Sequence, residues 1–211
     1  MKRILIAVPC FDHVDVDFAQ SLVSLDTADI GGKVSIAFLP GSLIYVARDM
    51  LADQAIAMDA DYVLWLDSDV VFTPDLLHNL LAHDVDFVTG MYFERRPPFG
   101  PVLYKKIRYG ETPAEYEAEK YLDYPQKELF EIDACGFGAV LVRTQVIKDV
   151  RERYYHAFAP QQGFGEDISF CIRAKNVGYK LWCDSSIQLG HVTRSVSNEE
   201  TYLALKERSA K

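Results

Sequence analysis

The chain alternates short, nearly uninterrupted apolar runs with stretches of helical period, and this alternation limits its possible folds more than any other feature. Residues 3–8, 34–39 and 62–66 form apolar runs of strand length, and apolar side chains recur at helical spacing between them. A strand without polar alternation is typical of a sheet that is covered on both faces. The sequence therefore predicts an α/β fold in which a mostly parallel central sheet carries helices on both faces.

Capping residues and chain breaks place the remaining elements. Ser42 predicts the N-cap of one helix, and Thr73 followed by Pro74 predicts the start of another. Residues 94–127 are rich in proline, tyrosine and charge without a lasting period, so we predict a long loop there. Further helices are expected from Thr144 and over residues 166–177, and further strands over residues 87–88, 129–134, 139–142 and 179–183.

The charge and the cysteine content exclude several classes of protein. With 31 acidic and 22 basic residues the chain has a formal net charge of −9, which argues against broad binding to nucleic acid. The four cysteines are scattered without a CxxC pair, so they indicate neither a zinc site nor a disulfide framework. No apolar run approaches the roughly 20 residues needed to cross a bilayer, and no cleavable leader is visible. We therefore expect a cytoplasmic protein without a membrane span.

Two carboxylates directly follow the third apolar run, in the segment Asp67-Ser68-Asp69. In an open α/β sheet, ligands bind outside the carboxyl ends of the strands, which is where this segment falls. Two carboxylates one residue apart can face one hard cation, Mg²⁺ or Mn²⁺, that keeps other positions open for phosphate oxygens. Asp and Ser are also common in solvated turns, but the position after a buried strand favours the metal-binding interpretation.

Three further residues have suitable chemistry and also an ordinary structural explanation. Glu166 and Asp167 open a helix, where the helix dipole favours acidic side chains. His191 follows an apolar run, and a histidine in that position is commonly a hydrogen-bonded structural residue. The residues alone do not decide between these roles and catalytic ones.

Two other segments are ambiguous in the same way. Arg48 lies in a predicted helix and fits a surface arginine with an ion pair to Asp49 or Asp53. The turn Gly136-Phe137-Gly138 fits a β-bulge or hairpin turn and, equally well, a close approach of the backbone to a ligand.

Taken together, the order and spacing of five segments resemble the family 2 type of GT-A glycosyltransferase. They are similar to that family's loop after the first strand, its ARN-like helix segment, its metal-binding DxD motif, its GED-x-x-F segment and its late histidine. In this chain the five segments are Ala7-Val8-Pro9, Ala47-Arg48-Asp49, Leu66-Asp67-Ser68-Asp69, Gly165-Glu166-Asp167-Ile168-Ser169-Phe170 and Gly190-His191. The matches run in family order from residue 4 to about residue 193, and they imply a Rossmann-like GT-A sandwich.

The resemblance implies an enzyme that moves a sugar from a nucleotide diphosphate to an acceptor hydroxyl, with inversion. It implies that Asp67, Asp69 and His191 bind the metal ion. Because an imidazole nitrogen suits Mn²⁺ better than Mg²⁺, we expect Mn²⁺ to work best. The resemblance also implies that Asp167 is the base that takes the acceptor proton and that Glu166 positions the acceptor.

The resemblance also assigns the two substrate sides of the site. The acceptor is a glycan, a lipid-linked sugar or another hydroxyl compound, approached by Gly136, Phe137 and Gly138. The nucleotide side of the donor is contacted by Pro9, Cys10, Phe11, Arg48, Asp67 and Ser68.

Domain organisation and nucleotide follow from the same resemblance. We expect one GT-A domain over residues 1–211, with a donor-binding half at about 1–93, a flexible loop at about 94–127 and an acceptor half at about 128–193. Members of the family often end the second strand with an acid that contacts uracil, whereas this chain reads Ala37-Phe38-Leu39-Pro40-Gly41. A UDP-sugar is the first choice by family frequency, with GDP- and dTDP-sugars left open.

Two alternatives belong to other functional classes. A sugar nucleotidyltransferase would carry a glycine-rich loop with a basic residue after the first strand, and the segment Val8-Pro9-Cys10-Phe11-Asp12 has neither. A non-catalytic nucleotide- or sugar-binding module would be expected to have lost one of the acidic or histidine site residues, and all of them are present. The transferase interpretation is therefore preferred.

Overall fold

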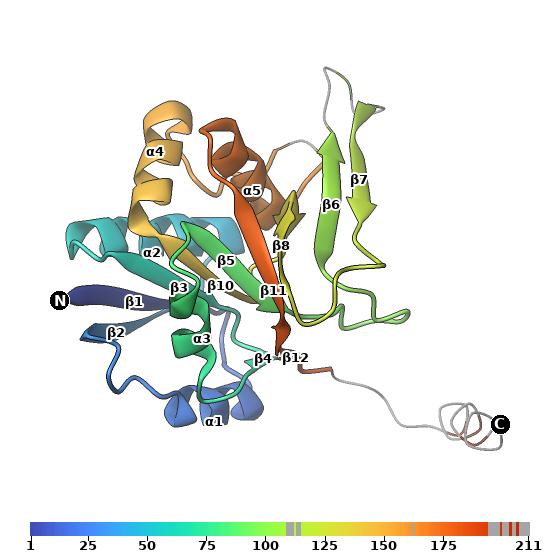
Figure 1. Cartoon of the computed structure of the whole chain (residues 1–211), viewed down its shortest axis with the longest axis horizontal. Coiled ribbons are helices and arrows are strands. Elements are labelled where there is room, and N and C mark those ends of the chain that lie inside the picture. The colour runs from blue at the N-terminus through green and yellow to red at the C-terminus, as the bar shows by residue number, and fades with distance from the viewer. Residues whose placement is uncertain are drawn as a thin grey trace.

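The central element of the computed structural model is a seven-stranded sheet with the strand order β2-β1-β3-β10-β5-β11-β8 (Figure 1). The structure describes residues 1–108, 112, 115–161 and 163–193, and the single residues 199, 203 and 206. Five strands run in one direction, whereas β10 and β8 run against their neighbours, so the predicted mostly parallel sheet is confirmed. The strands are β1 (Lys2–Pro9), β2 (Gly32–Leu39), β3 (Tyr62–Leu66), β5 (Phe87–Met91), β8 (Leu129–Ile132), β10 (Ala139–Arg143) and β11 (Leu181–Gln188).

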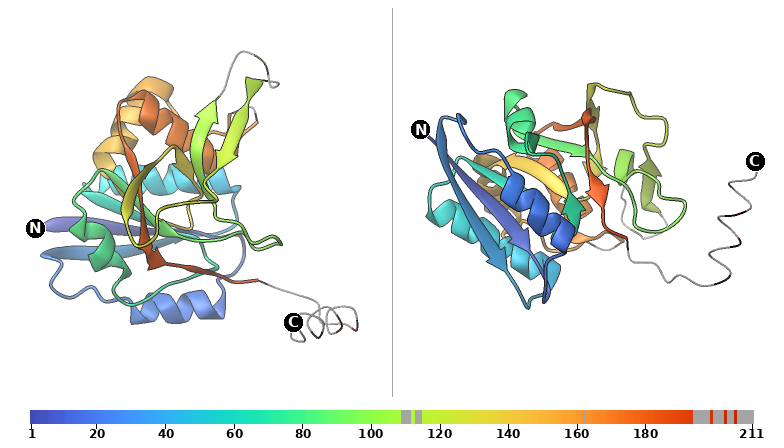
Figure 2. Two further views of the ribbon diagram at one scale, coloured as in Figure 1. Left: turned by 45° about the vertical axis from the view of Figure 1, so that its right-hand side comes forward. Right: turned by 90° about the horizontal axis from the view of Figure 1, so that it is seen from below.

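Helices cover both faces of this sheet, as the uninterrupted apolar strands predict. Helices α1 (Val16–Ser24) and α3 (Leu76–Ala82) pack on one face. The opposite face carries α2 (Ile44–Ala57), α4 (Thr144–Tyr154) and α5 (Glu166–Asn176), and the views in Figure 2 show the same layers. All five residues of β3 are buried because this strand lies in the middle of the sandwich. In the described part of the chain, no helix has the length and apolar character of a membrane span.

Two predicted helix starts are wrong, by one and by two residues. Helix α2 begins at Ile44, with Leu43 rather than the predicted Ser42 at the N-cap position and no side-chain cap hydrogen bond. Helix α3 begins at Leu76 rather than after Thr73. The Thr73 hydroxyl bonds to the Asp75 carboxylate, and the Thr73 carbonyl accepts from the Leu76 amide, so residues 73–76 form a separate turn.

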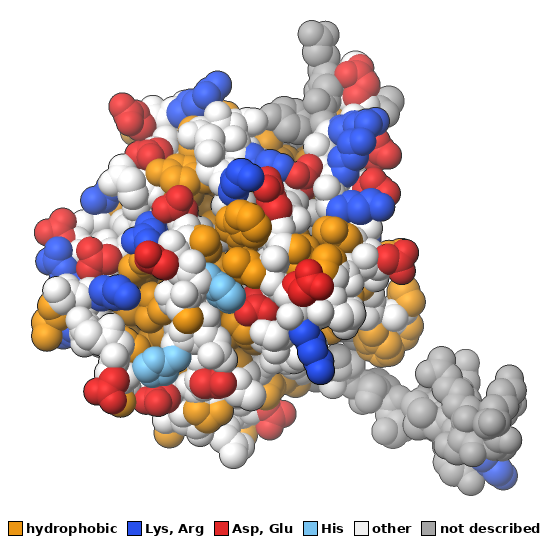
Figure 3. Space-filling model, in the orientation of Figure 1, with side chains coloured by type: hydrophobic (Ala, Val, Ile, Leu, Met, Phe, Trp, Pro, Cys, Tyr) orange, Lys and Arg blue, Asp and Glu red, His pale blue; other side chains and the backbone are white. Residues whose placement is uncertain are grey.

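The segment predicted as a long loop, residues 94–127, contains a β-hairpin. Strands β6 (Leu103–Arg108) and β7 (Glu117–Lys120) pair antiparallel, and β9 (Ala134–Cys135) completes a second sheet. Leu103 is buried, and Tyr104 and Ile107 pack against the core, but most other residues of the two strands are charged, so a periodicity test does not detect the hairpin. Cross-strand ion pairs, Lys105 with Glu119 and Arg108 with Glu117, line it, and Figure 3 shows basic and acidic side chains side by side there.

A two-stranded pair at the carboxyl edge of the sheet joins distant parts of the chain. Strand β4 (Val70–Val71) follows the Asp67-Ser68-Asp69 segment, and β12 (Gly190–His191) follows β11. In their antiparallel register His191 lies opposite Val70, and the Val192 amide donates to the Asp69 carbonyl at 2.9 Å. This pairing brings the Asp69 side chain beside His191.

Aromatic rings fill the core between the sheet and α5, below this edge. Phe158 stacks on Phe170 with ring centroids 4.6 Å apart, and it meets Trp65 edge-on at 4.9 Å and Phe137 at 5.4 Å. All four side chains are at most 1% exposed. The four rings form a densely packed cluster beneath the polar residues at the sheet edge and help to hold them in place.

Replacing Phe158 with alanine is therefore expected to lower the free energy of unfolding by about 3–5 kcal/mol, because a cavity opens among the three rings that Phe158 contacts. Phe38→Ala is the matched control, since Phe38 is 47% exposed on the edge strand β2. It should cost less than about 1 kcal/mol. Urea unfolding at neutral pH measures both, and equal losses would show that the ring cluster does not stabilise the fold.

Candidate active site

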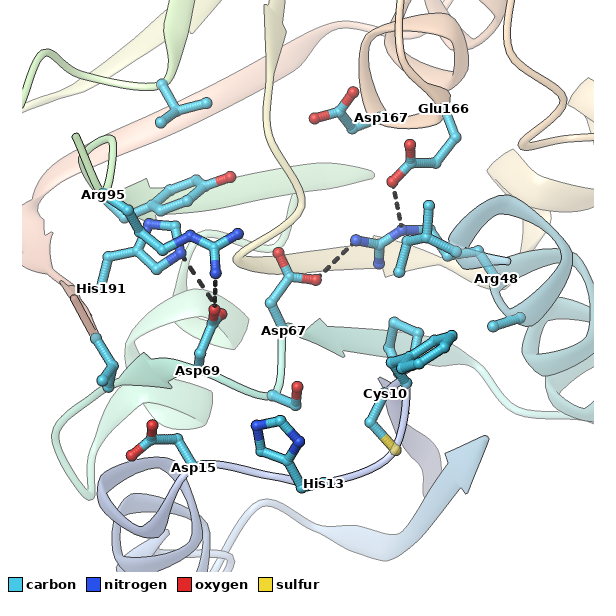
Figure 4. A pocket seen from close by; sticks show the side chains of 18 of the residues that line it. Cys10, His13, Asp15, Arg48, Asp67, Asp69, Arg95, Glu166, Asp167 and His191 are labelled. Carbon is cyan, nitrogen blue, oxygen red and sulfur yellow. Dashed lines mark hydrogen bonds and ion pairs between the residues drawn. The ribbon is translucent and has the colours of Figure 1, made fainter. Parts of the chain in front are cut away.

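A cavity of about 1120 Å³ opens at the carboxyl edge of the sheet, where an open α/β sheet is expected to bind ligands (Figure 4). Six segments line it: the end of β1 and the loop behind it, the start of α2, the segment after β3, the segment after β5, the first residues of α5, and the chain around His191. The cavity therefore collects residues from both halves of the sequence.

Arg48 is the central side chain of this site. It is 2% exposed, and its guanidinium Nη2 donates to Asp67 Oδ1 at 2.8 Å while Nε donates to Glu166 Oε1 at 3.4 Å. The group also lies over the rings of Trp65 and Phe137, 5.7 Å and 5.1 Å from their centroids. The prediction of a surface arginine paired with Asp49 or Asp53 is wrong.

The aspartates of that wrong prediction belong to another arginine. Arg151 on α4 contacts both Asp49 and Asp53, so these carboxylates tie α2 to α4. Arg48 faces the opposite way, into the cavity. Its Nη1 atom is buried and has no hydrogen-bond partner among the described residues.

Burial, opposed by the charge of Arg48, raises the pKa of Asp67 above its ordinary value. For Arg48 itself, burial opposes the charged form, but Asp67 and Glu166 outweigh it and raise its pKa. The arginine thus remains a cation in the interior. Asp67 keeps a carboxylate at the cavity wall because this cation is beside it.

Asp69 lies between a histidine and a second arginine. His191 Nε2 is 3.5 Å from Asp69 Oδ1, and Arg95 Nη1 is 2.7 Å from Asp69 Oδ2. Although burial acts to raise it, the contacts with His191 and Arg95 lower the pKa of Asp69 below its ordinary value. Asp67 and Asp69 therefore diverge, one toward Arg48 and the other toward His191 and Arg95 (Figure 4).

The hydrogen bonds of His191 define which nitrogen is available. Nδ1 lies 2.8 Å from the Phe93 carbonyl, which can only accept, so Nδ1 carries a proton and Nε2 faces Asp69. Burial opposes the charged imidazole, but Asp69 and the Phe93 carbonyl raise the pKa of His191. An acceptor nitrogen opposite a carboxylate oxygen calls for a proton or a cation between them.

The described residues do not contain a gathered group of three or more His, Cys, Asp or Glu side chains ready to hold a metal ion. Asp69 and His191 come together as the sequence predicts, but Asp67 is turned to Arg48. Binding of a cation by all three predicted ligands requires Asp67 to rotate or to use its second oxygen. It also requires Arg95 to leave Asp69.

Glu166 and Asp167 both line the cavity from the first turn of α5. Glu166 holds Arg48, so its placement is not explained by the helix dipole alone. Burial, followed by the charge of Glu166, raises the pKa of Asp167 to about 6. A carboxylate with such a pKa is mostly ionised at neutral pH and is a better proton acceptor than an ordinary aspartate.

The predicted nucleotide contacts share the same cavity. Pro9, Cys10, Phe11 and Ser68 all line it, and the Phe11 side chain is 72% exposed, which excludes a core role for this ring. Figure 4 shows Cys10 on the opposite side of the pocket from Asp167. The cavity thus has an end near β1 with an exposed aromatic ring and an end near α5 with a base.

The predicted acceptor residues Gly136, Phe137 and Gly138 do not line the cavity. Phe137 is 1% exposed within the ring cluster, and the two glycines lie against Tyr92. Tyr92 itself lines the cavity. Burial, and then the charges of Asp67 and Asp167, raise its pKa well above the ordinary value.

Sequence reasoning missed several lining residues. Tyr92, Glu94 and Arg95 follow β5, which was predicted to end at residue 88 and runs to Met91. A strand of full length would have placed all three at the carboxyl edge, beside Asp67. The other lining residues that were missed include Asp12, His13 and Asp15, which follow β1.

Comparisons of the sequence with protein families and with curated proteins find no match. Among solved structures, the chain is similar to the crystal structure of A197 from STIV, with a TM-score of 0.62 and 20% identity over 92% of this chain and 87% of that one. It is also similar to GalNAc-T7 with UDP, GalNAc and Mn²⁺, with a TM-score of 0.60 and 12% identity over 98% of this chain and 48% of that one. The chain thus spans about half of GalNAc-T7. These likenesses show the fold alone, and they agree with the predicted α/β class, a mostly parallel sheet with helices on both faces.

The buried arginine generates a prediction about stability. Arg48→Met is expected to lower the free energy of unfolding by about 3–5 kcal/mol, because it leaves two carboxylates buried without their cation. Adding Asp67→Asn should restore part of this loss, since one buried charge is then removed. Urea unfolding of the single and double variants measures both effects.

Arg3→Met is the control for this experiment. Arg3 is a half-exposed arginine with a 3.6 Å ion pair to Asp59, so its loss should change stability by less than about 1 kcal/mol. A loss in Arg48→Met no larger than in Arg3→Met would contradict the central role of the buried arginine.

Proposed function

We propose that this protein is a metal-dependent glycosyltransferase, similar to the family 2 type, whose residues 1–211 form one GT-A domain. It transfers a sugar from a nucleotide diphosphate, with a UDP-sugar favoured, to the hydroxyl of a glycan, a lipid-linked sugar or another acceptor. The observation that carries the proposal is the meeting of Asp69, His191, Arg48 and Asp167 in one cavity at the carboxyl edge. The bound ligands of the GalNAc-T7 structure, UDP and Mn²⁺, support the same class of donor.

The charge of the cavity supports a requirement for a cation. Seven carboxylates line it against three arginines, so a nucleotide diphosphate would meet net negative charge there. The carboxylates are Asp12, Asp15, Asp67, Asp69, Glu94, Glu166 and Asp167, and the arginines are Arg48, Arg95 and Arg96. A divalent cation offsets this charge and lets the diphosphate approach the carboxylates.

The donor set at the edge fits Mn²⁺. Asp69 and His191 offer an oxygen and an imidazole nitrogen that already face each other, and Asp67 has a carboxylate one residue away from Asp69. These three residues would hold the ion. When bound, Mn²⁺ supplies positive charge that stabilises the departing diphosphate.

The residues of the chain divide the remaining work. Arg48 holds Asp67 and Glu166 in place at the cavity wall. Asp167 takes the proton from the acceptor hydroxyl as that oxygen attacks the anomeric carbon. The bond from this carbon to the diphosphate breaks on the opposite side, and this single displacement gives inversion. The ring of Phe11 offers a surface for the nucleobase, at the end of the cavity formed by the loop after β1.

The first experiment is a calorimetric titration with UDP, in the presence and absence of Mn²⁺. The wild-type protein should bind UDP at least tenfold more tightly with Mn²⁺, since the carboxylates repel the free diphosphate. Asp69→Asn and His191→Ala should lose this gain, because each removes one ligand atom. Asp53→Asn on α2, outside the cavity, is the matched control and should behave like wild type.

Arg95 supplies a variant with the opposite expected effect. Its guanidinium forms an ion pair with Asp69, a predicted metal ligand. Arg95→Ala should therefore raise the affinity for Mn²⁺ in the absence of nucleotide, whereas Arg96→Ala should leave this affinity unchanged. Binding of UDP that ignores Mn²⁺ and all of these variants would refute the metal site. GDP and dTDP in parallel titrations identify the base.

Asp167 generates a prediction about pH. Because the base must be ionised, kcat/KM should fall about tenfold per pH unit below a pKa of about 6. Asp167→Asn should lower kcat about 10²–10⁴-fold and abolish this limb of the profile. Its affinity for UDP with Mn²⁺ should stay unchanged. An Asp167→Asn variant that keeps wild-type turnover would exclude Asp167 as the base. A wild-type protein that binds UDP but neither hydrolyses nor transfers the sugar of any UDP-sugar would indicate a binding module.

A further inference from the structure

We infer that the hydroxyl of Tyr92 binds the sugar that is transferred. This inference rests on the proposed function and names a contact of the same site that neither motif spacing nor the predicted ligand set contains. Tyr92 follows β5 at the carboxyl edge of the sheet and is 5% exposed, yet it lines the cavity. Its ring lies against the ring of His191, with centroids 5.5 Å apart.

The two glycines after Cys135 make room for this side chain. A Cβ atom on Gly138 would lie 2.9 Å from the Tyr92 ring, so any larger residue would displace the ring. A Cβ atom on Gly136 would lie 1.9 Å from the hydroxyl oxygen, which is its nearest neighbour. Gly138 therefore accommodates the ring, and Gly136 accommodates the hydroxyl group itself.

This hydroxyl has no structural partner. Among the residues that the structure describes, none forms a hydrogen bond with Tyr92 Oη, although buried tyrosine hydroxyls usually find one. A phenylalanine would fill the same space against His191 and the glycines without leaving a polar group unpaired. The Tyr92 hydroxyl is not one of the buried side-chain atoms that lack a partner in the described part of the chain, so it is open to the cavity and can bond whatever enters there.

The position of the hydroxyl identifies that partner. Tyr92 lines the cavity together with Asp67 and Asp167. In the proposed function Asp67 is on the side of the diphosphate and Asp167 is on the side of the acceptor, and Figure 4 shows Asp167 above Asp67, at the start of α5. The group that must lie between diphosphate and acceptor is the sugar. A neutral phenol there can donate a hydrogen bond to a sugar hydroxyl or ring oxygen and can accept one in return.

Several charged residues of the cavity already have partners. Arg48 binds Asp67 and Glu166, Arg95 binds Asp69, and Glu94 contacts Lys120. The Tyr92 hydroxyl is a neutral group that can distinguish a nucleotide sugar from the nucleotide alone. It is a contact for specificity that adds to the charged contacts of the diphosphate.

The test compares ligands with and without the sugar. Wild-type protein and Tyr92→Phe are titrated by calorimetry, in Mn²⁺, with UDP and with UDP-glucose, UDP-galactose, UDP-GlcNAc and UDP-GalNAc. Tyr92→Phe should bind UDP within twofold of wild type and should bind the tightest of the UDP-sugars about 5- to 10-fold more weakly, as expected for one lost hydrogen bond. Gly136→Ala, which pushes the hydroxyl aside, should show the same selective loss.

Tyr62→Phe is the matched control, because Tyr62 is a buried tyrosine of β3 that does not line this cavity. It should bind both kinds of ligand as wild type does. Three outcomes would overturn the sugar contact while leaving the nucleotide site standing. They are an unchanged affinity of Tyr92→Phe for the UDP-sugars, equal losses of affinity for UDP and UDP-sugar, and a wild type that binds UDP but none of the four UDP-sugars. A wild type that binds no nucleotide would remove the proposed function and this contact together.

Discussion

The site depends on one buried cation. The guanidinium of Arg48 ties the segment after β3 to the first turn of α5 through Asp67 and Glu166, and it rests on the rings of Trp65 and Phe137. A charge at this depth is costly unless it is paired, and the two carboxylates are costly without it. Each of the three groups is therefore held in place by the others. The aromatic cluster below sets how closely the strand end and the helix start can approach.

Much of the fold can be predicted from the sequence because its apolar runs mark the segments that become buried. Runs such as residues 62–66 have no polar alternation, so they belong in a sheet with helices on both faces, as found. Hydrophobic periodicity does not detect an element that is stabilised by ion pairs, and the β6–β7 hairpin was missed for that reason. Periodicity also does not predict the order in which the strands pair in the sheet. The antiparallel strand β10 is as apolar as its parallel neighbours.

The part of the site that could be predicted consists of residues at the ends of strands and helices. Asp69, Asp167 and His191 each follow or open a regular element at the same edge, so they meet. Tertiary packing decided the rest. Phe137 was assigned to an acceptor by its glycine neighbours, but its ring is needed in the core, and the glycines serve Tyr92 instead. The ion pair of Arg95 with Asp69 depends on how residues 93–101 fold back, which no local pattern records.

The place of β10 in the sheet has a consequence for how the chain is made. β3 and β5 are close in sequence, yet β10, formed much later in the chain, lies between them. As the polypeptide leaves the ribosome, the edges of β3 and β5 that later face β10 emerge with their backbone N–H and C=O groups unpaired. Closure must wait until residue 143 has been released, and β11 is added later still. A nascent chain of this protein thus passes through a long interval with open strand edges, during which a chaperone that covers them would be of most use.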